Sequence, residues 1–161
     1  MMWFDKHDQR ALFGDQRKET LTVTDRTHRE DGTRVLSIHP DVRMDFRALP
    51  FADDTFSLVV FDPPHLVRAG PASWLAAKYG KLGSDWREDI RRGFSECFRV
   101  LRVHGVLIFK WSEVQVPTRE VLALTPHRPL FGHPSGKRSG THWMTFMKPV
   151  DEPAASDGDE S

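Results

Sequence analysis

The chain of 161 residues has one cysteine, one tyrosine and no apolar stretch long enough to cross a membrane. Cys97 alone can form no internal disulfide and cannot build a cysteine-rich zinc site, so a reducing cytoplasm is the expected location. A spanning helix needs roughly 20 apolar residues, and residues 1–6 lack the apolar centre of a secretory signal. These absences favour a globular protein that does not enter a membrane.

Basic residues are missing from the last twelve positions of the chain, although they equal the acids in number over the whole sequence. Residues 150–161 contain five acids and no Lys or Arg, and they are rich in Pro, Ala, Ser and Gly. This composition predicts a disordered acidic tail. The whole chain balances 23 basic against 23 acidic residues, so residues 1–149 carry a net charge of about +5. We expect these residues to form one domain, whose charge permits a nucleic-acid partner.

The clearest local patterns alternate between strand and helix. Residues 56–61 and 106–111 are continuous apolar runs bounded by turn residues, which is typical of buried parallel strands. Between them, residues 85–103 repeat apolar side chains at three- and four-residue spacing, which predicts an amphipathic helix. Asp85 is the expected N-cap, and Glu88 would complete a capping box. Strand, helix and strand in this order predict a right-handed parallel unit.

Further along the chain, residues 130–133 and 141–147 alternate on both sides of a Gly-rich basic loop, and a short helix is expected near 118–124. Near the N-terminus, residues 20–23 and 33–38 alternate around a turn. Both pairs predict antiparallel hairpins. The predicted class is α/β, with a Rossmann-like, mostly parallel sheet that ends in an antiparallel hairpin.

The motif Asp62-Pro63-Pro64-His65 directly follows the first apolar strand. Neither proline can donate to a strand ladder, so the strand must end there, with an acid at its carboxyl end on a stiff loop. In open α/β sheets, ligands bind at this edge. A strand in the centre of the sheet is expected here. A purely structural role, as a rigid strand exit, is the alternative.

This motif resembles the D-P-P-Y catalytic loop of class I S-adenosylmethionine-dependent methyltransferases that act on amino nitrogens. The resemblance implies that Asp62 and the Pro63 carbonyl hold the target amine. His65 stands where that family usually has Tyr, Phe or Trp, which implies that its ring stacks on the target base. Its ordinary pKa of ~6.5 leaves a second role open, as a base.

Residues 41–56 resemble a second segment of that family, G-D-A-R-x-L-P-F-x-D-x-S-F-D, and residues 96–111 resemble its helix-turn-strand E-x-x-R-V-L-K-P-G-G. The first resemblance implies that Asp45 and Phe46 lie beside the adenine of the methyl donor, S-adenosylmethionine. A carboxylate there accepts from the adenine amine and an apolar side chain covers the ring. The donor-binding residues predicted from these motifs are Asp45, Phe46, Arg47, Phe61 and Asp62.

The chain departs from the family in its N-terminal half. The glycine-rich first motif is missing, and no G-x-G occurs anywhere in the sequence. Those glycines normally let backbone approach the donor. Residues 3–6 and 11–17 are candidates for short strands that end in an acid. Asp5 or Asp15 could therefore grip the donor ribose, and a role as surface turn acids is the alternative.

Residues near the ends of the later strands are candidates for contacting the substrate. Base stacking and phosphate binding are the expected roles, and the candidates are Lys110, Trp111, Lys137, Arg138, His142 and Trp143. A Trp at helical spacing is more often a core residue, which is the alternative. The eight histidines show no ligand spacing on a helix, so no metal site is expected.

Residues 3–148 also resemble small phage and bacterial proteins that are called methyltransferases without a defined substrate. Shared stretches include W-F-D-K, F-D-P-P-H-L, F-K-W and G-T-H-W-M-T-F. The resemblance implies N-methylation of an exocyclic amine on a nucleic-acid base, with DNA the first expectation and RNA the second. Two alternatives remain: a non-catalytic binding module that lost the donor or needs a partner chain or second copy to complete its site, and methylation of a small molecule or protein.

Overall fold

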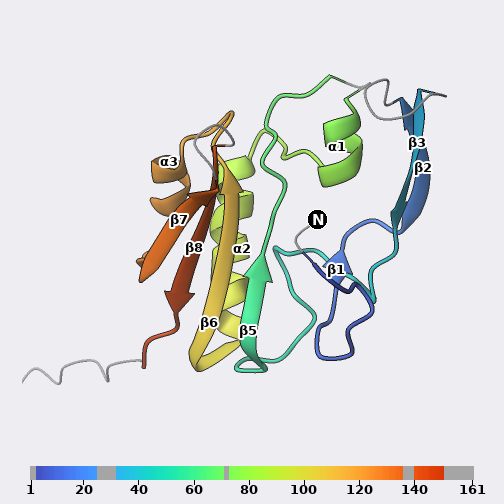
Figure 1. The fold of residues 1–161 in the computed structure, drawn as a ribbon. Helices are drawn as coiled ribbons and strands as arrows, with labels where there is room; N and C mark the ends of the chain where they lie inside the picture. The colour runs from blue at the N-terminus through green and yellow to red at the C-terminus, as the bar shows by residue number, and fades with distance from the viewer. Residues whose placement is uncertain (1–2, 25–31, 71–72, 136–139, 151–161) are drawn as a thin grey trace, which may run out of the picture.

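The computed structural model describes residues 3–24, 32–70, 73–135 and 140–150. They form a mixed α/β fold with small sheets (Figure 1). Its elements in chain order are β1 (Gly14–Asp15), β2 (Glu19–Thr24), β3 (Thr33–Ile38), β4 (Val42–Arg43), β5 (Phe56–Phe61), α1 (Trp74–Tyr79), α2 (Trp86–Val100), β6 (Leu101–Ser112), α3 (Thr118–Leu122), β7 (Phe131–Ser135) and β8 (Thr141–Met147).

The largest sheet contains four strands in the order β5-β6-β8-β7. β5 pairs with β6 in parallel across α2, whereas β8 is antiparallel to both β6 and β7. This confirms the predicted parallel unit and the closing hairpin. The strand β6 begins at Leu101, directly after α2, which is five residues earlier than the apolar run indicates.

Two expectations about the sheets are wrong for the described residues. β5 lies at the edge of its sheet and not in the centre, because no described strand pairs with its other side. The pairing is also not mostly parallel, since three of the five strand pairs are antiparallel. Both differences have one cause: the strands of the N-terminal half form two separate two-stranded sheets and do not extend the main one.

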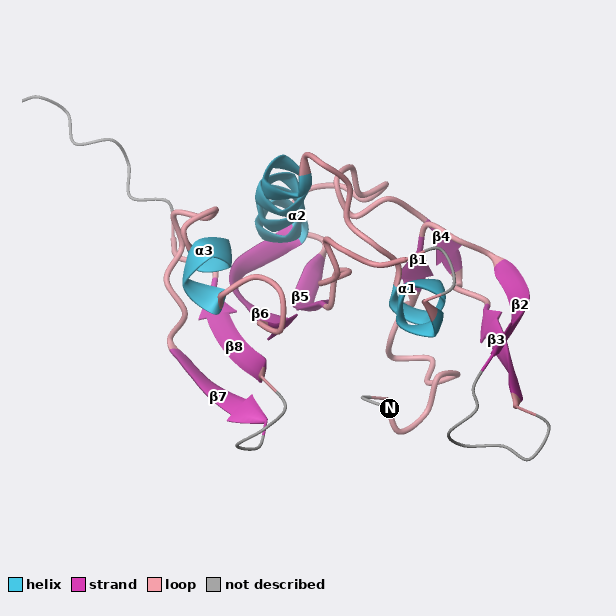
Figure 2. Ribbon diagram, turned by 90° about the horizontal axis from the view of Figure 1, so that it is seen from above, coloured by secondary structure: helices cyan, strands magenta, loops and turns pink. Residues whose placement is uncertain are grey.

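Helix α2 covers one face of the four-stranded sheet (Figure 2). Its predicted apolar stripe is confirmed, since the side chains on it are buried against the sheet and make the core with Phe109 and Phe146. The prediction of a capping box at the start of α2 is wrong. Asp85 has φ −92° and ψ 27°, which is not the extended conformation of a capping residue, and its side chain makes no cap hydrogen bond. Glu88 pairs with Arg91 instead, at 2.6 Å.

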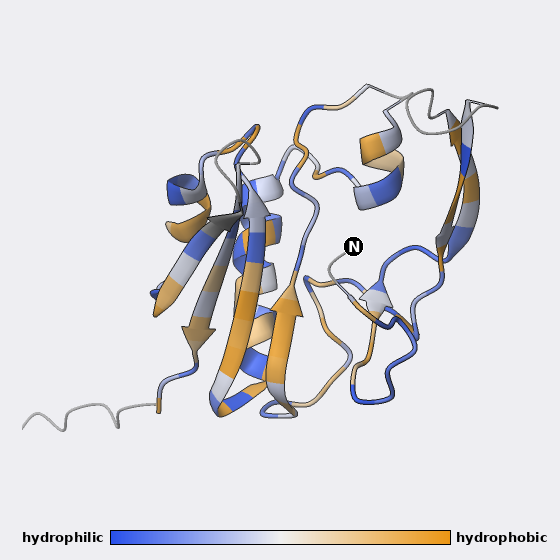
Figure 3. Cartoon of the chain, viewed as in Figure 1, coloured by the Kyte–Doolittle hydropathy of each residue, from blue (hydrophilic) through white to orange (hydrophobic). Residues whose placement is uncertain are grey.

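In the described part of the chain, no helix covers the opposite face of this sheet (Figures 1 and 2). The strand β5 and the middle of β6 are nevertheless rich in apolar residues (Figure 3). Alternation explains the contrast: on β6, Leu107, Phe109 and Trp111 are buried towards α2, whereas Ile108 and Lys110 between them are only half-buried. The uncovered face of β6 therefore presents Ile108 and Lys110, and not the side chains that pack against α2.

The N-terminal half forms two small sheets. β2 and β3 pair as the predicted antiparallel hairpin, and β1 pairs in parallel with β4. β1 lies within the predicted strand at 11–17, but residues 3–6 form no strand. Arg17 ties this half to α1, because its Nη1 donates to the Ala77 carbonyl at 2.7 Å.

Two expectations concern residues that lie wholly or mostly outside those the structure describes. The acidic tail, apart from Val150, and the basic loop residues Lys137 and Arg138 lie outside the described residues. None of the helices in the described ranges has both the length and the apolar character needed to span a bilayer.

Candidate functional site

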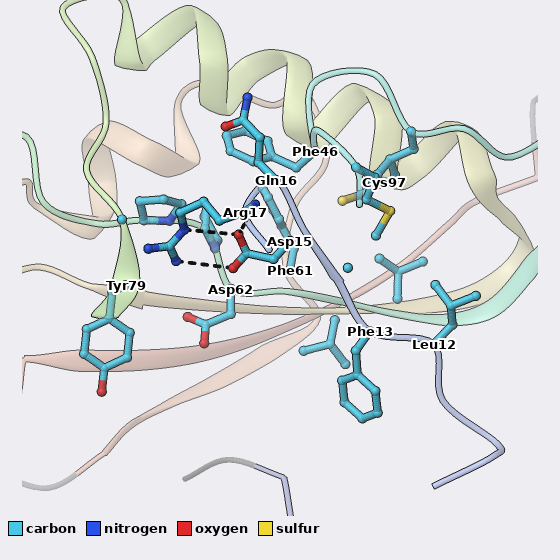
Figure 4. A pocket seen from close by; sticks show the side chains of 18 of the residues that line it. Leu12, Phe13, Asp15, Gln16, Arg17, Phe46, Phe61, Asp62, Tyr79 and Cys97 are labelled. Carbon is cyan, nitrogen blue, oxygen red and sulfur yellow. Dashed lines mark hydrogen bonds and ion pairs between the residues drawn. The ribbon is translucent and has the colours of Figure 1, made fainter. Parts of the chain in front are cut away.

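A cavity of about 470 Å³ lies between the end of β5 and the segment around β1 (Figure 4). In the close view, Leu12, Phe13 and Cys97 lie towards one side, and Asp15, Arg17 and Tyr79 lie towards the other. The cavity therefore has an apolar part and a polar part. Of the predicted site residues, those that line it are Asp15, Phe46, Phe61, Asp62, Pro63 and Pro64.

Asp62 sits at the carboxyl end of β5, as predicted, and its carboxylate is held by Lys110. Lys110 Nζ donates to Oδ1 at 3.0 Å and to Oδ2 at 2.8 Å. The Lys110 ammonium also lies 5.8 Å from the centre of the Trp143 ring. About a third of the Asp62 side chain and a quarter of the Lys110 side chain remain exposed. The pair is therefore open to competition from an incoming polar group.

Asp15 is the acid at the end of β1, and it faces the same cavity. Its carboxylate accepts from the Arg17 backbone N–H at 2.8 Å and from the Arg17 guanidinium at 3.2 and 3.3 Å. Because Arg17 is also anchored on α1, the carboxylate is fixed in orientation. Asp5 is exposed and bonds the His7 backbone N–H at 2.8 Å. Asp5 does not line the cavity, so only one of the two candidate acids is near it.

Two phenylalanines form one wall of the cavity. The rings of Phe46 and Phe61 lie 5.5 Å apart, and Phe61 packs edge-on against Phe94 of α2 at 5.6 Å. Gly93 makes room for both, because a Cβ at this position would lie 2.5 Å from Phe61 and 2.7 Å from Phe46. The two rings are tilted by 54° to each other, and together they give the cavity an apolar wall.

Asp45 and Arg47 do not line this cavity, although Phe46 between them does. Arg47 donates to the Asp45 carboxylate at 2.6 Å and to Asp89 of α2 at 2.9 Å. These hydrogen bonds from Arg47 lower the pKa of Asp45. They also attach the segment that carries Phe46 to α2. In this structure the two charged residues support the cavity wall.

His65 lies outside the cavity lining, next to Tyr79. The two rings are 5.9 Å apart and tilted by 48°. Burial lowers the pKa of His65, and the Asp62 carboxylate opposes this shift while Lys110 adds to it. Burial at this position therefore favours the neutral form of the imidazole. Tyr79 was not among the predicted site residues, since it lies 14 residues from His65 in sequence; it lines the cavity together with Gly80.

The structure places the other predicted substrate residues, Trp111, Trp143 and His142, in three different surroundings. Trp111 is buried towards α2 and donates its indole N–H to the Val116 carbonyl at 2.9 Å, so it belongs to the core. Trp143 shares the uncovered face of the sheet with Lys110. His142 Nε2 lies 2.8 Å from Glu113 Oε1, and this contact lowers the pKa of Glu113.

Cys97 is buried in the hydrophobic core, and burial raises the pKa of its thiol. Sequence reasoning missed Gln16, Arg17 and Lys81 in the cavity lining. The only signal for Arg17 was its position next to Asp15. Among the described residues, no group of three or more His, Cys, Asp or Glu side chains converges in a way that could hold a metal ion.

Comparison with known proteins assigns no family. No protein-family model matches the chain, and no curated protein matches it. Among solved structures, the chain is similar to the crystal structure of the PH0226 protein from Pyrococcus horikoshii OT3. The identity is 15%, the match covers 70% of this chain and 60% of that one, and the TM-score is 0.49. The chain thus matches less than two thirds of that protein, and a likeness this distant assigns no function.

Proposed function

We propose that this chain is an S-adenosylmethionine-dependent methyltransferase that modifies an exocyclic amino group of a nucleic-acid base, with DNA the first candidate and RNA the second. The observation that carries the proposal is that Asp62, at the end of β5, lines the same cavity as Asp15, at the end of β1. A donor held by one acid would have its reactive end near the other.

The residues around the cavity fit the donor. The cavity volume of about 470 Å³ lies within the range of small-molecule sites. Asp15 supplies a fixed carboxylate for ribose hydroxyls, and the Phe46–Phe61 wall suits an adenine ring. Gly14 and Gly80 also line the cavity, and the side chains of Met44 and Pro64 pack against them. When bound, the donor supplies a methyl group on a positively charged sulfur.

The chain itself must orient the amine and exclude water. An exocyclic amine is a poor nucleophile, because its lone pair is delocalised into the ring. Asp62 accepting one N–H and the Pro63 carbonyl accepting the other favour a more tetrahedral nitrogen. Positioning of this kind supplies up to roughly 7–11 kcal/mol of a barrier. The target amine replaces Lys110 at one Asp62 oxygen, which the partial exposure of both side chains permits.

The second candidate is a binding module without catalysis, and one observation favours it. Lys110 satisfies both oxygens of Asp62, as a purely structural ion pair would. The unpaired outer side of β5 in the described residues further allows that a partner chain completes the donor site. Methylation by the isolated chain separates these readings.

The test uses the Asp62→Asn variant with Asp85→Asn as its control. Asp85 is exposed and makes no cap hydrogen bond, so the Asp85→Asn substitution should leave the methylation rate unchanged. Transfer of labelled methyl from S-adenosylmethionine to single-stranded and duplex DNA and to RNA is measured. Wild type and the control should methylate at least one of these nucleic acids. The methylation rate of Asp62→Asn should be lower by on the order of 100-fold. Full activity of Asp62→Asn, or label found only in protein or small molecules, would overturn the proposal.

A further inference from the structure

The uncovered face of the four-stranded sheet carries side chains in two rows that cross the strands. In the row nearest Asp62, Lys110 of β6 pairs with Trp143 of β8, which pairs with His133 of β7. The row below contains Ile108, Thr145 and Phe131 in the same register. Cross-strand partners of this kind lie next to each other on one face of a sheet.

These rows are accessible and contain flat rings. Phe131 is 68% exposed, His133 is exposed, and Trp143 is half-buried beside the Lys110 ammonium. A single exposed ring needs no explanation, but rings gathered on one open face form a surface on which a planar ligand can stack. The farther end of the face is aliphatic instead, with Leu58 56% exposed.

The charge on this face also has one sign. Among the described face positions of β5, β6, β7 and β8, the ionisable side chains are Lys110 and His133, and none is acidic. The acid nearest to them is Asp62, which Lys110 already contacts. The strand positions of this face therefore carry no acid, and the face borders the proposed catalytic carboxylate, which Lys110 holds in an ion pair.

We infer that this face is a stacking platform for single-stranded nucleic acid, in which Trp143 and Phe131 stack on the bases next to the target and lead the strand to Asp62. The inference rests on the proposed function, because it names the form in which the substrate reaches that site. Flat rings on an open sheet suit unpaired bases, which expose their faces. A duplex hides those faces inside its stack. Two rows match two nucleotides.

The experiment measures fluorescence anisotropy of labelled 12-nucleotide DNA and RNA of mixed sequence, each as single strand and as duplex, over a range of salt concentrations. Phe131→Ala is the main variant, because its side chain is exposed on an edge strand and its loss should leave the fold intact. Trp143→Ala is the second. The matched control is Phe4→Ala, which removes an exposed ring that belongs to none of the strands of this sheet.

Single strands should bind wild type and Phe4→Ala equally, and more tightly than duplexes. Phe131→Ala and Trp143→Ala should each weaken binding by roughly 5- to 150-fold. The dependence on salt should not change, because neither variant removes a charge. Binding that prefers duplex, or that neither variant weakens, would overturn the inference, as would dimerisation through this face in sedimentation. Retained binding of S-adenosylhomocysteine in such a case would leave the proposed function standing.

Discussion

Lys110 donates to both carboxylate oxygens of Asp62, at 3.0 and 2.8 Å, and so links the ends of two parallel strands. The register explains the contact: Phe61 lies opposite Phe109, so the next residue on each strand is brought to the same edge. Because Lys110 also faces Trp143, this single ion pair connects the cavity to the uncovered face of the sheet.

The Asp62–Lys110 pair should contribute little to stability. Both side chains are partly exposed, so we expect a coupling free energy of about 0.2–1 kcal/mol from the cycle of Asp62→Asn, Lys110→Met and the double variant. Urea unfolding measures it. A coupling above about 3 kcal/mol would identify a structural ion pair and argue against a catalytic role for Asp62.

Gly93→Ala should disturb the aromatic wall of the cavity. The added Cβ would lie 2.5 Å from Phe61 and 2.7 Å from Phe46, and Phe61 is buried and cannot move freely. Overpacking costs about 1–3 kcal/mol, and the better helix propensity of Ala returns up to about 1 kcal/mol. We therefore expect net destabilisation in chemical denaturation and weaker donor binding. A more stable variant with unchanged binding would show that the wall is not packed as described.

His104→Gly should stabilise the protein. His104, near the start of β6, adopts φ +62°, a left-handed conformation that glycine adopts without strain. The gain should be about 0.5–1 kcal/mol, reduced by the extra freedom of glycine in the unfolded chain. Thermal unfolding of His104→Gly beside His104→Ala checks this, and equal midpoints for the two variants would contradict it.

Stability should fall in acid through Glu96. The Arg99 hydrogen bond lowers the pKa of Glu96 below its ordinary value of 4.5, so this contribution is present above about pH 4.5 and is lost as the pH falls through the lower native pKa. Asp45 behaves in the same way through Arg47, from an ordinary pKa of 3.8. Urea midpoints between pH 3 and 7 should decline less in Glu96→Gln than in the wild type.

The control for this measurement is Glu88→Gln, an exposed acid on the same helix. It should reproduce the wild-type decline. An equal decline in Glu96→Gln would mean that Arg99 does not hold the Glu96 carboxylate in solution.

Local patterns were sufficient to predict the second half of the fold. The apolar runs that became β5 and β6, the stripe on α2 and the β7–β8 hairpin are each determined by neighbouring residues and by burial of one face. Chain position alone could not reveal that β5 is an edge strand. That depends on which distant strands pair with it, and the N-terminal strands pair with each other.

The site shows the same division. Asp62 and its prolines were predictable, because proline ends a strand wherever it occurs. The contacts of other predicted site residues were not predictable. Asp45 was expected beside the donor, and in the structure the nearby Arg47 holds its carboxylate. Trp111 was expected at the substrate, but its side chain points into the core. Such contacts depend on side-chain direction, which residue spacing does not determine.

The most direct test of the central claim is calorimetric titration of the isolated chain with S-adenosylhomocysteine. Asp15→Asn changes the acid that lines the cavity, and Asp8→Asn is the matched control, since Asp8 pairs with Arg10 outside it. Micromolar binding to the wild type and to Asp8→Asn, weakened at least about tenfold in Asp15→Asn, is the predicted result. No binding to the wild type, or equal binding to all three proteins, would contradict the assignment of this cavity to a methyl donor.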